Sequence, residues 1–503
     1  MNSTPAAPDD ARRELARKYD AVAYASRANA LSHPRHLATV ATLFGLAPPP
    51  VGTCRVLEVG CNDGANLLPM AATLPGARFV GCDLSERAIA TARRVAQELE
   101  IDNVTLEQRD LATLADDAEP FDYIIAHGVY SWVPPQVRDA LLDLAARRLA
   151  PHGAMFVSLN VFPGCRIRQA AWEMLHQHVD GIADPKAKLD AARAFAALMA
   201  EPGGTQTESD AALQQEFRRL ATQSDSALFH DDLAVPNDPV YFHEFAAHLA
   251  RHELAFLAEA KLSMMTVAGL PPRMQQFVAG MDRLEREQYL DFARVVRFRQ
   301  SVVCRADAAA GHGDRTSKVS AMHVAATMRL VRAAAESRAF TPEADADPNL
   351  RALRGVLEWL IQAAPRIVPV AEVESWQREH PSEGDSGARP LPALLVHACF
   401  AGEVDLYVLP PPLAPVAGPR PCASAIARWQ VGHHATVTNL RHEPLRIDDL
   451  LARKLLALLD GTRTRAELAT ALAKLLPPAE QHQAEQRTEA YLSHFALHGL
   501  LVA

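Results

Sequence analysis

The sequence lacks the features that mark membrane-spanning, secreted and zinc-ribbon proteins. None of its 503 residues belongs to an apolar run of about 18, so no segment is expected to cross a membrane. Residues 1–10 are polar and acidic and show no apolar stretch behind a basic start, which argues against a signal peptide. The seven cysteines are odd in number and form no Cys-x-x-Cys pair, which argues against a disulfide framework and a zinc ribbon. We therefore expect a cytoplasmic protein.

The length, composition and net charge are those of a globular protein with several domains. A chain of this length exceeds what one hydrophobic core holds, so about three domains are expected. Hydrophobic residues make up 49% and charged residues 22%, which is typical of globular proteins. The net charge of −9 gives no general attraction to nucleic acid.

The period of the apolar residues changes along the chain. Residues 10–47 show a helical pattern, and the three prolines at 48–50 end it because proline cannot continue a helix. Short apolar runs then alternate with helical segments, which predicts βαβ units in a parallel sheet. The predicted strands are residues 55–59, 77–82, 104–108, 121–126 and 155–159. After residue 160 the pattern is mainly helical to about residue 305.

We predict an α/β protein in four parts. These are an amino-terminal helical cap (1–50), a Rossmann-like sheet domain (51–200), a helical middle domain (201–307) and a smaller carboxyl-terminal region (319–503). The last part of that region reads helix, turn, helix, helix and predicts a winged-helix-like module. Its basic residues are interspersed with acidic and apolar positions, so a protein contact or a packing role is favoured over DNA binding.

Polar residues and glycines stand at the carboxyl ends of four predicted strands, where open parallel sheets bind their ligands. Because these ends meet at one edge of the sheet, the residues are expected to line one site. In strand order they are Glu58 and Gly60, then Asp83 and Leu84, then Asp110 and Leu111, then His127 and Gly128.

The chemistry of these residues favours a cationic nucleoside over a phosphate ligand. In the turn Gly-Cys-Asn-Asp-Gly, Asn62 occupies the place where a dinucleotide fingerprint has its second glycine. Asp83 follows Gly64 by about 20 residues, the spacing of an acid that bonds ribose hydroxyls. Asp110 and Leu111 suit an adenine amino group and ring. The alternative is an α/β domain whose strand ends are acidic without function.

Residues 56–64, Val-Leu-Glu-Val-Gly-Cys-Asn-Asp-Gly, resemble the first motif of class I methyltransferases, with Asn in place of the usual central glycine. Residues 19–34 and 121–134 resemble a narrower family, and residues 288–301 are similar to the end of its regulatory domain. That family joins the methyltransferase to the regulatory domain and includes bacterial outer-membrane-protein lysine methyltransferases. The resemblance implies a Rossmann-like class I methyltransferase sheet and S-adenosylmethionine as cofactor.

Further site residues are predicted around these strand ends. Tyr130 and Trp132 follow the fourth strand, where a methyl acceptor would enter, and Asn160 ends the fifth strand. These three are the predicted catalytic residues. Tyr19 and Tyr24 are expected to close over the cofactor from the amino-terminal helices. Packing roles stay open for Trp132 and for both of these tyrosines.

The resemblance implies methyl transfer to a protein lysine, on an outer-membrane or secreted protein before export. A protein substrate is therefore the expected partner, with no nucleic acid and no membrane insertion, and a homodimer stays open. Two alternatives are a natural-product methyltransferase and a non-catalytic regulator that binds S-adenosylmethionine. His248 and His252 have the spacing of zinc ligands, but a solvated or hydrogen-bonded helix face is favoured, and no metal is expected.

Overall fold

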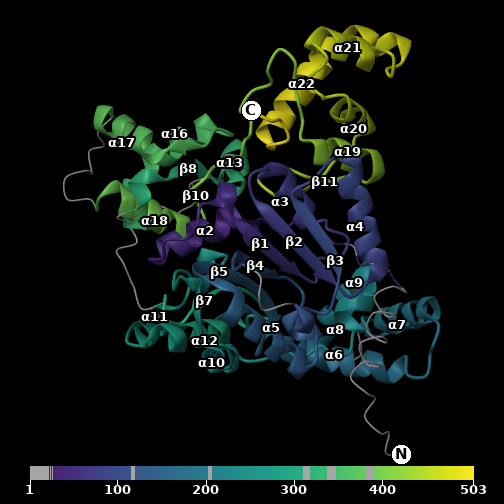
Figure 1. The fold of residues 1–503 in the computed structure, drawn as a ribbon, viewed down its shortest axis with the longest axis vertical. Helices are drawn as coiled ribbons and strands as arrows, with labels where there is room; N and C mark the ends of the chain where they lie inside the picture. Colours follow the sequence, from purple (N-terminus) through teal and green to yellow (C-terminus); the bar gives the residue numbers. More distant parts are fainter. Residues whose placement is uncertain are drawn as a thin grey trace, which may run out of the picture.

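The computed structural model describes residues 22, 24, 26–114, 119–201, 207–309, 316, 318–336, 347–380 and 389–503. A seven-stranded sheet in the order β3-β2-β1-β4-β5-β7-β6 lies at the centre of the molecule (Figure 1). Its strands are β1 (Arg55–Val59), β2 (Arg78–Asp83), β3 (Val104–Gln108), β4 (Phe121–Ala126), β5 (Leu149–Asn160), β6 (Leu254–Glu259) and β7 (Phe298–Arg305). β1 to β5 run parallel, whereas β7 runs antiparallel to both of its neighbours. This sheet confirms the predicted Rossmann-like α/β class.

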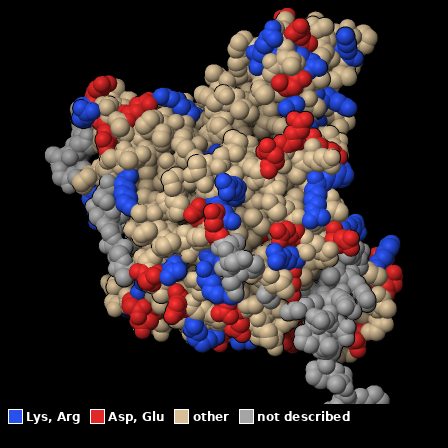
Figure 2. Space-filling model, in the orientation of Figure 1, with Lys and Arg blue, Asp and Glu red and all other residues tan. Residues whose placement is uncertain are grey.

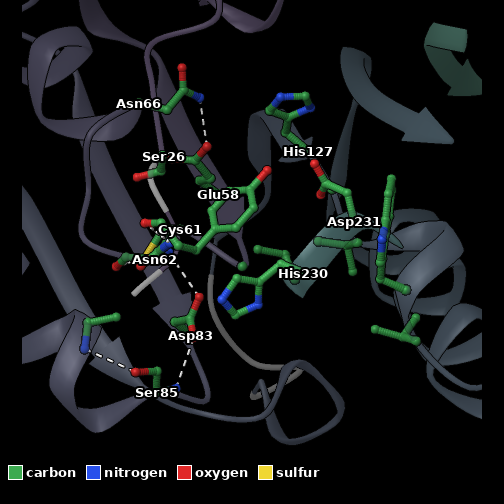
Figure 3. Close-up of a pocket in the computed structure, with 18 of the residues that line it drawn as sticks. Ser26, Glu58, Cys61, Asn62, Asn66, Asp83, Ser85, His127, His230 and Asp231 are labelled. Atoms are coloured by element: carbon green, nitrogen blue, oxygen red, sulfur yellow. Dashed lines mark hydrogen bonds between the residues drawn. The ribbon is translucent and has the colours of Figure 1, made fainter. Parts of the chain in front are cut away.

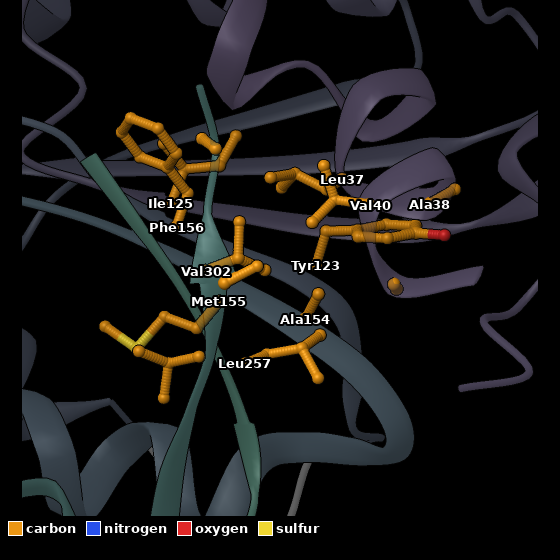
Figure 4. Close-up of a cluster of buried hydrophobic side chains, with 14 of the residues drawn as sticks. Leu37, Ala38, Val40, Tyr123, Ile125, Ala154, Met155, Phe156, Leu257 and Val302 are labelled. Atoms are coloured by element: carbon orange, nitrogen blue, oxygen red, sulfur yellow. The ribbon is translucent and has the colours of Figure 1, made fainter. Parts of the chain in front are cut away.

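The central strands are apolar on both faces because helices cover both sides of the sheet. Figure 4 shows side chains of β4 and β5 packed with those of α2 (Pro34–Leu43), β6 and β7. The labelled members are Leu37, Ala38, Val40, Tyr123, Ile125, Ala154, Met155, Phe156, Leu257 and Val302. Helix α2 begins after His33, whose ring Nδ1 accepts a hydrogen bond from the backbone N–H of Arg35.

The strand order places a topological switch point between β1 and β4. From β1 the chain moves outward through α3 (Leu67–Thr73), β2, α4 (Glu86–Glu98) and β3. It then returns to β4 on the other side of β1, and α5 (Pro135–Arg148) leads to β5. Ligands of such sheets bind at the carboxyl ends of the two strands that flank the switch point.

The middle region contributes strands as well as helices. Helices α6 (Cys165–His178), α7 (Pro185–Met199) and α8 (Glu208–Thr222) share a separate small core. The chain then passes through α9 (Asp225–Ala227), the π-helix η5 (Leu228–Asp232) and α10 (Phe242–Arg251) to β6, which belongs to the main sheet. Between β6 and β7 lie η6 (Leu262–Met265), α11 (Pro272–Ala279) and α12 (Arg283–Arg294). Strands β6 and β7 are not predicted from the sequence, because a short apolar run between helices can be either a strand or a buried helix segment.

The carboxyl-terminal region has two parts. The first holds a three-stranded sheet of β8 (His323–Ala326), β9 (Val368–Pro369) and β10 (Val404–Tyr407). Its helices are α13 (Met328–Ala335), α15 (Pro348–Ala352), α16 (Arg354–Ala363), α17 (Val370–Glu379) and α18 (Leu391–Ala401). Their apolar side chains belong to the same core as the large sheet.

The second part is a module with its own core. It consists of α19 (Ala425–His433), the hairpin β11 (Thr436–Thr438) and β12 (Pro444–Arg446), α20 (Leu450–Ala457), α21 (Arg465–Ala473), η8 (Pro478–Gln483) and α22 (Ala484–Leu497). On the face seen in Figure 2, Lys and Arg alternate with Asp and Glu over this module. Among the described residues, no helix has the length and apolar character needed to span a bilayer.

Candidate active site

A cavity of about 1670 Å³ opens at the carboxyl ends of the strands that flank the switch point. Pockets for single small ligands occupy about 300–1,000 Å³, so this cavity has room for more than one such ligand. Most of the predicted site residues line it: Tyr24, Glu58, Gly60, Asn62, Asp83, Leu84, Asp110, Leu111, His127, Gly128, Trp132 and Asn160. Tyr19 lies outside the described residues. Tyr130 is not among the lining residues.

The turn after β1 has a backbone shape that explains its sequence. Gly60, Asn62 and Gly64 all have positive φ, at 70°, 47° and 77°. Asn enters this left-handed region more readily than most residues with a side chain, which accounts for Asn at the usual glycine position. At Gly60 a Cβ would lie 3.0 Å from Cγ2 of Val129, so the turn also requires close approach to the loop after β4.

Asp83 holds this turn in place from the end of β2. Its Oδ2 accepts a hydrogen bond from the backbone N–H of Asn62 at 2.9 Å, and its Oδ1 accepts from the N–H of Ser85 at 2.9 Å. Ser85 in turn caps α4 through a bond to the N–H of Ala88. The carboxylate thus fixes two loops and still faces the cavity.

Glu58 is a buried acid at the end of β1, only 3% exposed. Its Oε1 accepts a hydrogen bond of 2.7 Å from Nδ2 of Asn66, whereas Oε2 is buried with no hydrogen-bond partner among the described residues. Burial raises the pKa of Glu58 to about 8; the Asn66 bond lowers it, and the charges of Asp83 and Asp63 raise it further. A cationic group of a ligand would satisfy Oε2 and ionise this carboxyl.

The segment before α2 crosses the same end of the cavity. The hydroxyl of Ser26 donates to Oδ1 of Asp63, and the backbone N–H of Asn29 donates to Oδ1 of Asn66 at 2.8 Å. Nδ2 of Asn62 donates to the carbonyl oxygen of Tyr24 at 3.4 Å. These bonds bring Tyr24 to the cavity, as the sequence predicts for the amino-terminal segment.

His127 lies beyond the end of β4 with its ring held by Ser158. Its Nδ1 is 2.9 Å from Oγ of Ser158, and the same hydroxyl accepts the N–H of Gly128 at 2.8 Å. Burial lowers the pKa of His127 to about 4. The ring is therefore neutral near pH 7 and can serve as a hydrogen-bonding group rather than as a cation.

The far side of the cavity comes from η5, which the sequence analysis did not single out. Figure 3 shows Glu58 and Asp83 on one side of the pocket, His127 and Asp231 on the other, and the ring of His230 between Asp83 and Asp231. Burial raises the pKa of Asp231 to about 6; the negative charge of Asp232 adds to the rise, and two arginines oppose it. The signal in the sequence was the cluster His-Asp-Asp at 230–232 within a helical region, and π-helices are frequent at functional sites.

Asp232 differs from its neighbour because it is a structural anchor. Its Oδ1 accepts hydrogen bonds from Nε of Arg168 at 3.0 Å, Nε1 of Trp172 at 2.7 Å and Nη2 of Arg219 at 3.0 Å. The side chain is 1% exposed. These bonds fix η5 against α6 and α8, so Asp231 faces the cavity from a rigid support.

Asn160 and Trp132 both reach the cavity, with different surroundings. Nδ2 of Asn160 donates to Oδ1 of Asn237 at 2.8 Å, and Nδ2 of Asn237 donates to the carbonyl oxygen of Asp231 at 2.7 Å. Asn160 therefore links the end of β5 to η5. The ring nitrogen of Trp132 is buried, with no hydrogen-bond partner among the described residues.

Tyr130, one of the predicted catalytic residues, points away from the cavity. Its side chain is 2% exposed, its hydroxyl lies 2.7 Å from Nδ1 of His248, and its ring packs edge-on against Phe245 at 5.2 Å. Tyr130 and Trp132 are two positions apart in the 3₁₀ turn η4 (Tyr130–Trp132). With three residues per turn, such side chains point in different directions, so one faces the cavity and the other faces α10.

His248 of α10 and His252, the residue just after that helix, join a cluster of side chains between α10 and α5. Nε2 of His248 is 2.8 Å and Nε2 of His252 is 3.4 Å from Oδ1 of Asp139 on α5, and Nδ1 of His252 is 2.7 Å from Oδ1 of Asp143. The ligand atoms of Asp139, His248 and His252 lie within 4.8 Å of one another. This cluster ties α10 to α5 and, through His248, to Tyr130.

Three family models match separate parts of the chain. They are described as "Methyltransferase domain" at residues 56–153, "Predicted methyltransferase regulatory domain" at residues 224–305 and "PKMT, C-terminal winged helix domain" at residues 419–490. The last match confirms the predicted winged-helix module and places the β11–β12 hairpin within it.

Solved structures resemble the whole molecule. The structure of PKMT2 from Rickettsia typhi has a TM-score of 0.81 at 23% identity and covers 95% of this chain and 100% of that one. The same protein in complex with AdoHcy has a TM-score of 0.77 at 22% identity, with the same coverage. At this identity the likeness shows the fold.

Curated relatives show the family. Uncharacterized protein RP789 of Rickettsia prowazekii is 35% identical over 291 residues, and the match spans 58% of this chain but only about half, 53%, of that protein. Uncharacterized protein RP028 of the same organism is 33% identical over 228 residues, which are 45% of this chain and 91% of RP028. The chain therefore belongs to the same family as RP028, and its residues 56–153 form a methyltransferase domain.

Proposed function

We propose that this protein transfers a methyl group from S-adenosylmethionine to the side chain of a protein lysine. One observation carries the proposal: a single cavity joins a cofactor end, at Glu58 and Asp83, to a second end around Asp231. The matching structure of PKMT2 and the winged-helix family model described as belonging to PKMT support a protein acceptor. The acceptor that we favour is an outer-membrane or secreted protein before export.

The residues of the cofactor end fit this cofactor. Oε2 of Glu58 offers a buried acceptor to its amino group, and the carboxylate of Asp83 offers acceptors to ribose hydroxyls. Asp110 and Leu111 would hold the adenine amino group and ring. When bound, the cofactor supplies a methyl group that is already activated by a positively charged sulfur.

The residues of the acceptor end suit an aliphatic amine. A lysine that enters the cavity, which Tyr24 and Trp132 line, leaves water, and this desolvation lowers the pKa of its ammonium group. Aromatic faces attract the cation as it enters. Because the pKa of Asp231 is about 6, its carboxylate is charged near pH 7.5, where it can orient the ammonium group and accept its proton.

Positioning is the main contribution that the fold can make. Because the methyl group is already activated, holding the two reactants in contact supplies most of what is needed, up to about 7–11 kcal/mol in well-oriented reactions. The rigid support of η5 by Asp232 and by Asn237 serves this purpose at the acceptor end.

The test is to label acceptors with the purified protein and methyl-labelled S-adenosylmethionine. The acceptors come from a strain that lacks the gene, separated into protein and small-molecule fractions. We expect label in ε-methyllysine of one or a few proteins, identified by mass spectrometry, and none with the Asp83→Ala variant. Label confined to small molecules would support a natural-product methyltransferase, and cofactor binding without transfer to either fraction would support a regulator.

A further inference from the structure

The carboxyl-terminal module reaches the cofactor end of the cavity through one hairpin turn. Strands β11 and β12 pair antiparallel, and residues 439–443 connect them; we call these five residues the wing turn. Glu443 of the wing turn and the adjacent Pro444 line the cavity, and His442 is 3% exposed. Helix α19 of the same module contacts α3, the helix that follows Asn66.

The wing turn is held in a fixed shape by its own hydrogen bonds. The backbone N–H of Asn439 donates to the carbonyl oxygen of Glu443 at 3.0 Å, and the N–H of Glu443 donates to Oδ1 of Asn439 at 2.9 Å. His442 lies in the left-handed region, at φ 63°. Glycine would adopt this conformation without strain, so a buried histidine here points to a role for its side chain.

A chain of buried hydrogen bonds connects this histidine to the cofactor end. Nε2 of His442 is 2.9 Å from Oδ1 of Asn66, and Nδ2 of Asn66 donates to Oε1 of Glu58 at 2.7 Å. All three side chains are at most 5% exposed. The ring of His442 also packs edge-on against that of His33, with centroids 5.0 Å apart.

The backbone fixes which atom of the amide faces which partner. Oδ1 of Asn66 also accepts the backbone N–H of Asn29 at 2.8 Å, and a backbone N–H can only donate. The atom at that position is therefore the oxygen, and Nε2 of His442 must carry a proton and donate to it. Nε2 of His442 and the backbone N–H of Asn29 thus hold the amide oxygen on the side away from Glu58. Oγ of Ser32 also contacts the amide, accepting from Nδ2 at 3.1 Å.

We infer that His442 is a positioning residue of the cofactor site, acting through Asn66. It holds the amide so that Nδ2 donates to Oε1 of Glu58 and Oε2 remains for the cationic group of the cofactor. Without it the amide keeps the backbone N–H of Asn29 and the hydroxyl of Ser32 as partners, but one of the donors that fix its oxygen is lost and its bond to the carboxylate is less firmly held. The inference rests on the assignment of the Glu58 end to S-adenosylmethionine. It makes the winged-helix module a structural component of that site, with its wing enclosed rather than offered to a nucleic-acid groove.

The test measures the affinity of the full chain for S-adenosylmethionine and S-adenosylhomocysteine by titration calorimetry. His442→Gly removes the side chain without backbone strain, and His442→Gln keeps a donor. His434→Ala is the matched control, because this histidine of the same module is exposed. Thermal unfolding of each variant without ligand reports the fold separately.

We expect His442→Gly to weaken binding by about tenfold, as removal of one buried hydrogen bond does. His442→Gln should restore most of the affinity, and His434→Ala should match the wild type. Asn66→Ala combined with His442→Gly should bind no more weakly than Asn66→Ala alone, because both changes break one chain.

Three results would overturn the inference. These are wild-type affinity in a folded His442→Gly variant, equal losses in the Gly and Gln variants, and additive losses in the double variant. Absence of binding by the wild type would overturn the cofactor assignment and the inference together. Binding by the wild type that His442→Gly leaves unchanged would overturn only the inference.

Discussion

The two ends of the cavity each hold an acid with a raised pKa, which lies above 7 at one end and below 7 at the other. The pKa of Glu58 is raised to about 8 by burial, with Asp83 and Asp63 adding to the rise. The pKa of Asp231 is also raised by burial, but only to about 6, because Arg168 and Arg219 oppose the shift. Burial and neighbouring charge together therefore leave Glu58 protonated and Asp231 ionised near pH 7. The cofactor end is prepared to receive a cation and release a proton, and the acceptor end is already charged.

The largest effect should come from Asp83→Ala at the cofactor end. The change removes the acceptors for two backbone N–H groups and for the ribose hydroxyls. Charge-assisted hydrogen bonds contribute about 1.5–3 kcal/mol each, so affinity for S-adenosylmethionine should fall by at least about a hundredfold in calorimetry. Asp102→Ala is the control, since that aspartate is exposed before β3. Unchanged affinity in the Asp83 variant would remove the ribose assignment.

At the acceptor end, Asp231→Asn should lower the rate of lysine methylation by about a hundredfold, the scale of a lost proton acceptor. Its affinity for S-adenosylmethionine should stay at the wild-type value. Because the folded-state pKa is raised, ionisation of Asp231 lowers the stability of the protein as the pH rises from about 4 to about 6, and the loss stays constant at higher pH. The variant should therefore be more stable at pH 8, by about 2 kcal/mol in denaturant unfolding.

Asp232→Asn is the matched control for that variant, one residue along the same π-helix. It should lower the free energy of unfolding by about 3 kcal/mol, because Arg168 and Arg219 lose a buried partner. If Asp231→Asn lowered both the methylation rate and the affinity for the cofactor, the assignment of separate cofactor and acceptor ends would be contradicted.

The pH dependence of cofactor binding tests the protonation of Glu58. Since a bound cation favours the ionised carboxyl, affinity should rise by about tenfold per pH unit below pH 8 and level off above it. Calorimetry at pH 7 in buffers of different ionisation enthalpy should show release of about one proton. Glu58→Gln should abolish both effects. A flat profile in the wild type would mean that Glu58 is ionised before the cofactor binds.

The smallest effect should come from Tyr130→Phe. Its hydroxyl bonds His248 away from the cavity, so methylation and cofactor affinity should be unchanged. Loss of that bond should lower the free energy of unfolding by about 1 kcal/mol. A tenfold loss of methylation would contradict this and show that Tyr130 contributes to methyl transfer.

The cofactor end of the cavity could be predicted from the sequence, and the acceptor end could not. The turn 60–64, Asp83 and Asp110 belong to one strand-turn-helix series, so their common location at the sheet edge followed from local pattern. The acceptor end depends on contacts between distant segments: Nε2 of His230 is 2.7 Å from the carbonyl oxygen of Val22, 208 residues earlier. No local pattern specifies such a contact, and none specifies that His442 reaches Asn66, 376 residues away. The sequence also does not show that Tyr130 points away from Trp132, because that depends on the 3₁₀ turn, which directs its side chains to different sides.

A crystal structure of the full chain with S-adenosylhomocysteine would test the two-ended cavity most directly. The account predicts the amino group of the nucleoside against the carboxyl of Glu58, its ribose hydroxyls at Asp83, and open space from its sulfur towards Asp231. A nucleoside bound against His230 and Asp231, or outside this cavity, would contradict it.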